Sequence, residues 1–259
     1  MSISSPSSDP ASAVETFHLA FLRVLEGSKE RSRWAVKGGF NLRAWFGSPR
    51  RSEDLDLDAV AWPAHGLAER VDAALRSKDL ELLLRTRGLR ILRATKPKQT
   101  ETTQQWKTAL EGVSTSVPLH TKIEFSHRRS SGEFFLEPVT AELARAHGIP
   151  AATVNHYGAA DAARQKIVAL GSRRVVQARD VFDLEHLFRF ARADPRPLGR
   201  EAAACIASAL ERALDMPFDA YRSQVVPYLA PDAQELHGSR TAWERMHESV
   251  VDRLSELAP

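Results

Sequence analysis

Residues 54 to 60 alternate acidic and apolar side chains, and this pattern constrains the fold more than any other segment. The run Asp54-Leu-Asp-Leu-Asp-Ala-Val60 has a period of two. Successive side chains of a β-strand point to opposite faces, so the acids share one face and the apolar residues share the other. The sequence therefore predicts a sheet with one buried face and one face that carries carboxylates.

A strand, a glycine turn and a helix precede this acidic strand. Residues 34 to 37 form a short strand-like run that ends at Gly38-Gly39. Residues 40 to 46 then follow a helical pattern until Gly47-Ser48-Pro49 interrupts it. We expect Ser48 to serve this turn.

A second alternating segment, residues 120 to 126, predicts another strand. Lys122 and Glu124 fall on one of its faces, and Ile123 and Phe125 fall on the other. We expect this strand to bring Glu124 toward the acidic strand.

The remaining elements follow from apolar periodicity and from turn residues. A hairpin is predicted from residues 80–93 and 104–110, linked by a polar loop at 95–103. Helical spacing predicts helices at 11–26, 67–77, 159–170, 179–192, 199–214 and 241–257.

The fold class expected from this order is α+β, with an α/β-type core. It consists of a mixed sheet flanked by helices and followed by a helical domain. Strand signals become rare after Pro150, so we place the boundary there. The expected domains are residues 1–150, with an N-terminal helix, and residues 151–259.

Composition sets the class of protein. A chain of 259 residues that is 43% hydrophobic is long enough to bury a sizeable core without stabilising cross-links. Its single cysteine excludes a disulfide framework. No stretch has the roughly 20 apolar residues that span a bilayer, and Met1 to Pro10 lacks the apolar core of a signal peptide. We expect a cytoplasmic protein with no membrane partner.

The net charge is only +3, but basic residues are clustered. Residues 28–51 contain seven Lys or Arg against one acid, and residues 82–107 show the same ratio. Such clusters favour phosphate-bearing partners, although single basic residues usually just solvate a surface.

The acids predict metal-assisted phosphate chemistry. Nucleotidyl transfer needs divalent metal between phosphate oxygens, and carboxylates on rigid strands hold such metals. Asp54 and Asp56 point the same way, and Glu124 from a neighbouring strand adds a third acid. Asp58 continues the alternation but lies roughly 13 Å along the strand from Asp54, so we place it outside the metal site.

The glycines before this strand fit a phosphate site. The run Lys37-Gly38-Gly39 at a strand-to-helix junction presents backbone N–H groups and a positive dipole end to a triphosphate. Either motif alone is more often structural, since Asp-x-Asp occurs on solvated strands and Gly pairs mark turns. Their order in one chain is what favours a site.

These motifs resemble a known family. Lys37-Gly-Gly-Phe-Asn-Leu-Arg43, followed by Arg51-Ser-Glu-Asp-Leu-Asp-Leu57, is similar to the AbiEii/AbiGii family of bacterial nucleotidyltransferase-fold toxins. Its later motifs are matched in the same order by Lys122-Ile-Glu124, Lys166 and Arg179-Asp-Val-Phe-Asp-Leu184. The resemblance covers residues 34 to 190.

The resemblance implies a polymerase-beta-like core that uses a nucleoside triphosphate with Mg²⁺ or Mn²⁺. It implies that Asp54, Asp56 and Glu124 hold metal and that Lys166 meets the triphosphate as a fourth catalytic residue. Asp180 matches a later acidic position of the family, with Asp183 beside it. The expected nucleotide-binding residues are Lys37, Gly38, Gly39, Arg51, Ser52, Lys166, Asp180 and Asp183.

The resemblance also implies a toxin with a cognate antitoxin, a role in phage defence, and transfer of a nucleotide to RNA. The expected acceptor is the tRNA 3′ end, so that translation is blocked. Phosphates of this RNA are expected to meet Arg85, Arg87, Arg90, Arg93, Lys96 and Lys98. Alternatives are transfer to a small molecule or protein hydroxyl, and a non-catalytic module that binds a nucleotide or a partner.

Without the resemblance, the later motifs favour a structural interpretation. A helical lysine such as Lys166 ordinarily faces solvent. Arg179, Asp180 and Asp183 have the spacing of surface ion pairs, worth a few tenths of a kcal/mol. The hypothesis that Asp180 or Asp183 orients Lys166 depends on the resemblance.

Overall fold

The computed structural model describes residues 9–27, 31–60, 62–112, 117–128 and 132–258. Residues 1–8, and Lys29 of the first basic stretch, lie outside the described residues, as does the side chain of Arg31. None of the helices in the described parts of the chain has the length and apolar character needed to cross a lipid bilayer.

The chain divides into two compact units. The first comprises Met1–Trp45 and Arg51–Tyr157, and the second comprises Phe46–Arg50 and Gly158–Pro259. Residues 151–157 stay with the first unit because the strand β7 (Thr153–Tyr157) pairs with two strands of its sheet. The units thus divide seven residues after the boundary expected at Pro150.

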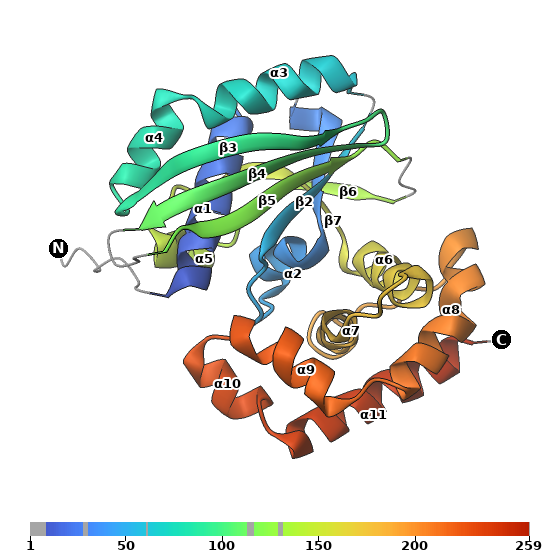
Figure 1. Cartoon of the computed structure of the whole chain (residues 1–259). Coiled ribbons are helices and arrows are strands. Elements are labelled where there is room, and N and C mark those ends of the chain that lie inside the picture. Colours follow the sequence, from blue (N-terminus) through green and yellow to red (C-terminus); the bar gives the residue numbers. More distant parts are fainter. Residues whose placement is uncertain (1–8, 28–30, 61, 113–116, 129–131, 259) are drawn as a thin grey trace. The chain divides into compact units, whose positions relative to one another are not determined.

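The first unit is built on a mixed seven-stranded sheet with the order β3-β4-β5-β2-β1-β7-β6 (Figure 1). Parallel pairs join β2 to β5 and β1 to β7, and the remaining neighbours are antiparallel. The strands not yet bounded are β1 (Trp34–Lys37), β2 (Asp54–Ala59), β3 (Leu89–Gln99), β4 (Thr103–Gly112), β5 (Leu119–Ser126) and β6 (Phe134–Pro138).

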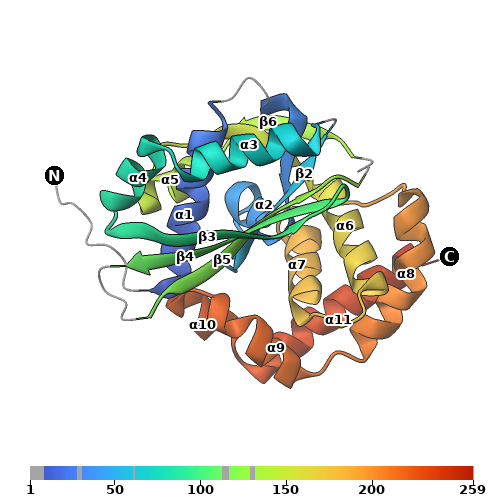
Figure 2. The same ribbon diagram turned by 45° about the horizontal axis from the view of Figure 1, so that its top comes forward.

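The helices of the first unit pack on one face of this sheet, as the two views of Figures 1 and 2 show. They are α1 (Pro10–Leu25), α2 (Gly38–Phe46), α3 (Ala64–Leu75), α4 (Lys78–Arg85) and α5 (Ala141–His147). The mixed sheet flanked by helices confirms the predicted fold class.

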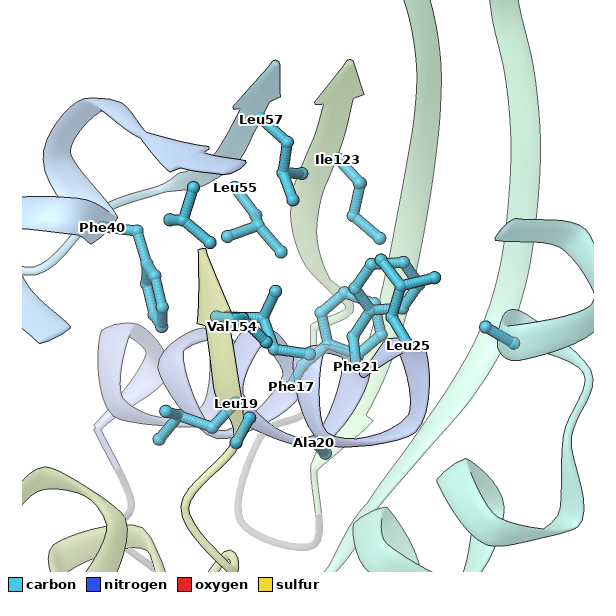
Figure 3. Close-up of a cluster of buried hydrophobic side chains, with 14 of the residues drawn as sticks. Phe17, Leu19, Ala20, Phe21, Leu25, Phe40, Leu55, Leu57, Ile123 and Val154 are labelled. Atoms are coloured by element: carbon cyan, nitrogen blue, oxygen red, sulfur yellow. The ribbon is translucent and has the colours of Figure 1, made fainter. Parts of the chain in front are cut away.

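The apolar sides of α1 and the sheet form the core of the first unit. Figure 3 shows Phe17 and Phe21 of α1 beneath Leu55 and Ile123 of the sheet. All four side chains are fully buried, and each contributes roughly 2 kcal/mol by leaving water. The alternation of β2 is thereby explained, because its leucines fill this core and its aspartates face away from it.

An ion cluster joins α1, α2 and α5. Glu15 accepts hydrogen bonds from Arg43 Nε at 2.9 Å and from His147 Nε2 at 2.8 Å. Burial alone would raise the pKa of Glu15, but the hydrogen bond from His147 and the charge of Arg43 lower this pKa to about 2. Through Arg43, the cluster ties the last turn of α2 to α1 and α5.

Two predicted segments differ from the structure. The expected strand over residues 80–93 is wrong for residues 80–85, which belong to α4. Ser77 caps this helix by accepting a hydrogen bond from the Leu80 N–H, and two acids occupy its first turn. The expected loop at 95–103 is also wrong, because β3 continues to Gln99 and a short turn leads into β4.

The second unit is helical, and its long helices pack around α7. It contains α6 (Ala159–Ser172), α7 (Ala178–Arg189), α8 (Gly199–Leu214), α9 (Phe218–Gln224), α10 (Pro231–His237) and α11 (Arg240–Leu257). At Gly171, where α6 meets α8, an added Cβ would lie 2.6 Å from the backbone oxygen of Cys205. Glycine is needed there for the two backbones to approach each other.

Candidate active site

The parallel pair β2 and β5 gathers the acids that the sequence singled out. The register sets Asp54 opposite Lys122 and Asp56 opposite Glu124. Side chains directly opposite each other in a ladder lie on the same face. We call the face that carries these four side chains and Asp58 the carboxylate face. The helices of the first unit pack on the other face.

Lys122 lies between two of the carboxylates. Its Nζ is 3.2 Å from Asp54 Oδ2 and 3.3 Å from Glu124 Oε2. Burial would lower the pKa of Lys122, but the nearby charges of Asp54, Asp56 and Glu124 outweigh burial and raise it. The ammonium is therefore a fixed positive charge in the middle of the acids.

The pKa values of the two partners of Lys122 are shifted in opposite directions. Burial raises the pKa of Asp54, and the charge of Lys122 only partly offsets this effect. Burial would also raise the pKa of Glu124, but a hydrogen bond from Gln105 Nε2 at 2.7 Å and the charge of Lys122 lower it. Glu124 is thus held in the ionised form.

Gly38 makes room for the carboxylate of Asp56. It has a φ of +69°, which favours glycine, and it is the first residue of α2. An added Cβ would lie 2.8 Å from Asp56 Oδ2. The carboxylate therefore lies against the amino-terminal end of a helix, where backbone N–H groups and the helix dipole favour negative charge.

Lys37 and Asp58 form a second ion pair on this face. Lys37 Nζ donates to Asp58 Oδ1, and the Tyr157 hydroxyl donates to Asp58 Oδ2 at 2.5 Å. Asp58 is buried by this arrangement, whereas Lys37 remains partly exposed. Asp58, which the sequence places outside the metal site, serves here as the partner of Lys37.

Arg51 and Ser52 connect the turn before β2 to its surroundings. Arg51 pairs with Asp9 and lies 4.0 Å from Glu15, so its guanidinium joins the cluster beneath α1. The Ser52 hydroxyl donates to the Asp54 backbone oxygen at 2.8 Å. Ser48, in the segment that belongs to the second unit, accepts from the Arg50 N–H at 3.4 Å, as expected of a turn residue.

The oxygens of Asp54 and Asp56 have the chemistry that a hard divalent cation prefers. Yet among the described residues no three His, Cys, Asp or Glu side chains converge on one point that could hold a metal ion. The donor chemistry of Asp54 and Asp56 fits Mg²⁺ or Mn²⁺, and the surroundings of Glu124 are those of an ion pair with Lys122.

The later motifs meet in the second unit. Lys166 of α6 places its Nζ 2.9 Å from Asp180 Oδ1 and 2.6 Å from Asp183 Oδ2 of α7. Both aspartates are completely buried and Lys166 nearly so. Without the resemblance, the sequence predicted a solvent-facing lysine and surface ion pairs. This prediction is wrong, because α6 and α7 pack these charged side chains against each other.

Two arginines complete this buried network. Arg50 donates to both carboxylate oxygens of Asp183, from Nε at 3.0 Å and from Nη2 at 2.9 Å. Arg173 Nε lies 3.0 Å from Asp180 Oδ2. Burial would raise the pKa of Asp183, but the charges of Arg50 and Lys166 hold it far below its usual range. Through Arg50, the segment Phe46–Arg50 is anchored to the second unit.

The basic residues predicted to bind RNA divide by their position on the sheet. Cross-strand pairing puts three of them on the carboxylate face: Arg90, Arg93 and Lys98. Lys107, which lies opposite Lys122, faces the same way. Arg90 pairs with Glu111 across the ladder, whereas Arg93, Lys98 and Lys107 are exposed.

The other three lie away from the carboxylate face. Arg85 ends α4 on the helix side of the sheet. Arg87 donates to the Gly148 backbone oxygen, and Lys96 pairs with Asp72 of α3 at 2.7 Å. The basic stretch of residues 82–107 is therefore not one surface.

Several residues of these sites were not predicted from the sequence. Lys122 was placed on the correct face, but its position between two acids depends on the register of β2 and β5. Gln105 reaches Glu124 only through the pairing of β4 with β5. Arg50 meets Asp183, 133 residues later in the chain, and no local pattern signals this contact.

Comparison with known proteins assigns this chain to a family. The family model described as nucleotidyl transferase AbiEii toxin, Type IV TA system, matches residues 20–256. The chain belongs to this family. The resemblance drawn from its motifs is confirmed, and the chain is a member of a family of nucleotidyltransferase toxins of toxin–antitoxin systems.

Two solved structures share the fold. A "putative nucleotidyltransferase from H. pylori" is 20% identical, with a TM-score of 0.59 and coverage of 95% of this chain and 96% of that chain. JHP933 from Helicobacter pylori is 18% identical, with a TM-score of 0.55 and coverage of 95% and 94%. A comparison with curated proteins gave no match.

Replacing Gly38 by Ala tests the role of the glycine turn. We expect Gly38→Ala to lower nucleotidyl transfer at least tenfold, because the new Cβ displaces the Asp56 carboxylate. Gly199→Ala is the matched control, since Gly199 has a φ of +70° but an added Cβ there meets nothing within 4 Å. Both variants bear similar backbone strain, of roughly 1 to 3 kcal/mol. Equal activity of the two variants would contradict the proposed role of Gly38.

Replacing Arg50 by Met tests the buried network. The change leaves Asp183 buried with one cation fewer, so we expect the second unit to lose roughly 3 kcal/mol or more of stability. Arg173→Met is the control, because its side chain is 39% exposed and its loss is screened by solvent. Hydrogen exchange of α7 reports the difference, and equal protection in the two variants would show that Arg50 is not the anchor.

Proposed function

We propose that this member of the AbiEii family transfers a nucleoside monophosphate from a triphosphate to an RNA acceptor, with the tRNA 3′ end as the acceptor and arrest of translation as the result. The observation that carries the proposal is the pairing of β2 with β5. It sets Asp54, Asp56 and Glu124 on one face, beside the amino-terminal end of α2.

The residues of the first unit have defined roles in this proposal. Asp54 and Asp56, with Glu124 as the third acid, hold Mg²⁺ or Mn²⁺, which neutralises charge on the reacting phosphates. Gly38 and Gly39 offer backbone N–H groups at the start of α2 to the triphosphate. Lys37, which ends β1 and is oriented by Asp58, supplies a positive charge, and Ser52, in the turn before β2, supplies a hydroxyl.

Arg51 enters the proposal as a nucleotide-binding residue with an additional task. Its ion pair with Asp9 and its approach to Glu15 fix the turn that leads into β2. A guanidinium held in this way loses little freedom when it meets a phosphate. Arg51 is therefore proposed to position the turn and to contact the triphosphate.

Lys166, Asp180 and Asp183 of the second unit are proposed to bind the nucleotide because they match the later motifs of the family. Lys166 is proposed to neutralise triphosphate charge, and the two aspartates, which contact it directly, keep it in one position. Because Lys166 also stabilises the helices, its substitution has to be judged by triphosphate affinity alongside thermal stability.

The acceptor RNA is proposed to lie across the carboxylate face toward β3. Arg90, Arg93 and Lys98 present positive charge there, and Lys107 lies between them and the acids. Phosphate contacts of this kind supply affinity without base specificity. Arg85, Arg87 and Lys96, also proposed from the sequence, are secondary, because two of them are engaged by other residues.

An alternative explanation for these charges is protection of the sheet edge. β3 is the outermost strand, and lysine, proline and β-bulges on an edge strand prevent pairing with other chains. The double variant Arg93→Glu/Lys98→Glu separates the two explanations. We expect it to weaken RNA binding roughly tenfold and to reduce the slope of log K against log salt by about one to two.

The matched control for this prediction is Arg76→Glu/Lys78→Glu. Both residues are exposed, at the end of α3 and the start of α4, and neither belongs to the proposed RNA-binding set; the change in net charge is the same. We expect this double variant to keep most of the affinity and the slope. Equal losses in the two double variants would show that net charge alone governs binding, and the proposed RNA path would be rejected.

The transfer reaction is tested with labelled triphosphates. Purified protein is incubated with each α-labelled triphosphate, Mg²⁺ and total RNA. We expect label in RNA of tRNA length, and a loss of at least a hundredfold with Asp56→Asn. Asp79→Asn, which alters an exposed acid in the first turn of α4, is the control and retains transfer.

Other outcomes identify the alternatives. Label in protein or in small molecules, with none in RNA, would overturn the RNA acceptor. Growth arrest on expression that persists in Asp56→Asn, without any transfer, would indicate a binding module instead of an enzyme. The family also implies a cognate antitoxin, and we place the reaction, with its triphosphate and RNA substrates, in the cytoplasm.

A further inference from the structure

The ammonium group of Lys122 lies between the carboxylates of Asp54 and Glu124. Sites with two metal ions separate the ions by about 3.5 to 4 Å and share carboxylates between them. A cation shared by Asp54 and Glu124 would have to lie between their carboxylates. Lys122 Nζ already lies there, 3.2 Å from one and 3.3 Å from the other.

The hydrogen bonds of Glu124 point to the same conclusion. Its Oε2 receives Gln105 Nε2 at 2.7 Å and also faces Lys122 Nζ. A carboxylate oxygen has two lone pairs, so these two donors use both lone pairs of Oε2. Binding a metal through this oxygen would require the loss of one of these contacts.

Asp56 has different surroundings. Its Oδ2 lies beside Gly38, at the start of α2. Asp56 and Asp54 belong to the same strand, β2. The two aspartates are separated by one residue and face the same way. One divalent cation can therefore use oxygens of both aspartates without displacing Lys122 from Glu124.

We propose that Lys122 takes the place of the second metal ion, so that the site binds a single divalent cation through Asp54 and Asp56. Glu124 is then a positioning residue that holds Lys122, together with Gln105. This inference rests on the proposed function, and it changes the role of the third acid from metal ligand to partner of a lysine.

The chemistry of a lysine explains what this replacement does. An ammonium carries one positive charge and three hydrogen-bond donors, and unlike a metal ion it forms no coordination bonds to oxygen. It can neutralise charge on phosphate oxygens, as a metal does. It also repels a second divalent ion from the space between Asp54 and Glu124, because the two positive charges would lie only a few ångströms apart.

The test counts and pairs Mn²⁺ ions by electron paramagnetic resonance. The full-length protein is loaded with Mn²⁺ and an equimolar non-hydrolysable triphosphate. Two Mn²⁺ ions in a shared carboxylate site give an exchange-coupled signal, whereas one ion gives the six-line signal of an isolated centre. We expect the wild-type protein to bind one uncoupled ion and Lys122→Met to bind a coupled pair.

Matched variants separate the local charge from general electrostatics. Lys107→Met removes the same charge from the residue opposite Lys122 on β4, on the same face, and should keep one uncoupled ion. Lys122→Arg retains the charge and should also keep one ion. Glu124→Gln should still bind one ion, whereas a site with three carboxylate ligands would lose metal. Circular dichroism verifies that each variant is folded.

Each remaining outcome rejects the inference, and the outcomes are distinguishable. A coupled pair in the wild-type protein together with nucleotidyl transfer would leave the proposed function intact and remove the role of Lys122. A single ion in folded Lys122→Met would do the same. No protein-bound Mn²⁺ in the wild-type protein would reject both the inference and the metal-dependent reaction.

Discussion

The parallel pairing of β2 with β5 is the contact on which the candidate site depends. Its register decides that Asp56 faces Glu124 and that Asp54 faces Lys122. A shift of one residue would turn every acid of β2 into the core and every leucine out of it. The buried leucines, packed against Phe17 and Phe21 of α1, therefore hold the carboxylates in place. Burial of one face fixes the chemistry of the other.

In both units, basic side chains neutralise carboxylates, but the carboxylates of the two units differ in burial. On the carboxylate face, Lys122 offsets the partly exposed Asp54 and Glu124, whose charges remain accessible to a ligand, whereas Lys37 pairs with the buried Asp58. In the second unit, Lys166 and Arg50 offset aspartates that are fully buried, and the network stabilises the packing of α6 on α7. Lys166 belongs to the second setting, because it is buried with both of its partners, and its role toward the triphosphate is a proposal from the family resemblance.

Local patterns were sufficient to predict the acidic strand, the glycine turn and most helices. The alternation of β2 and β5 is a direct consequence of one buried face, so it is visible in the sequence. The apolar run Leu82-Leu83-Leu84 is also typical of a buried strand, so local pattern alone does not identify α4, although Ser77 carries the signal of a helix start.

Contacts between distant residues could not be predicted. The hydrogen bond from Gln105 to Glu124 depends on the register of two strands, and the pair Arg50–Asp183 joins residues 133 positions apart. Division of the basic stretch between two faces follows from bulges in β3 and from the helix α4, neither of which has a local signature strong enough to place individual side chains. These are the features that decide which residues act together.

The triphosphate and its cation are proposed to bind at the acidic strand β2. Crystals grown with Mn²⁺ and a non-hydrolysable triphosphate allow the cation to be located by anomalous diffraction. We expect a manganese peak in contact with Asp54 and Asp56, with the triphosphate reaching the start of α2. A manganese peak and triphosphate bound elsewhere, with these aspartates still paired only with protein groups, would contradict it.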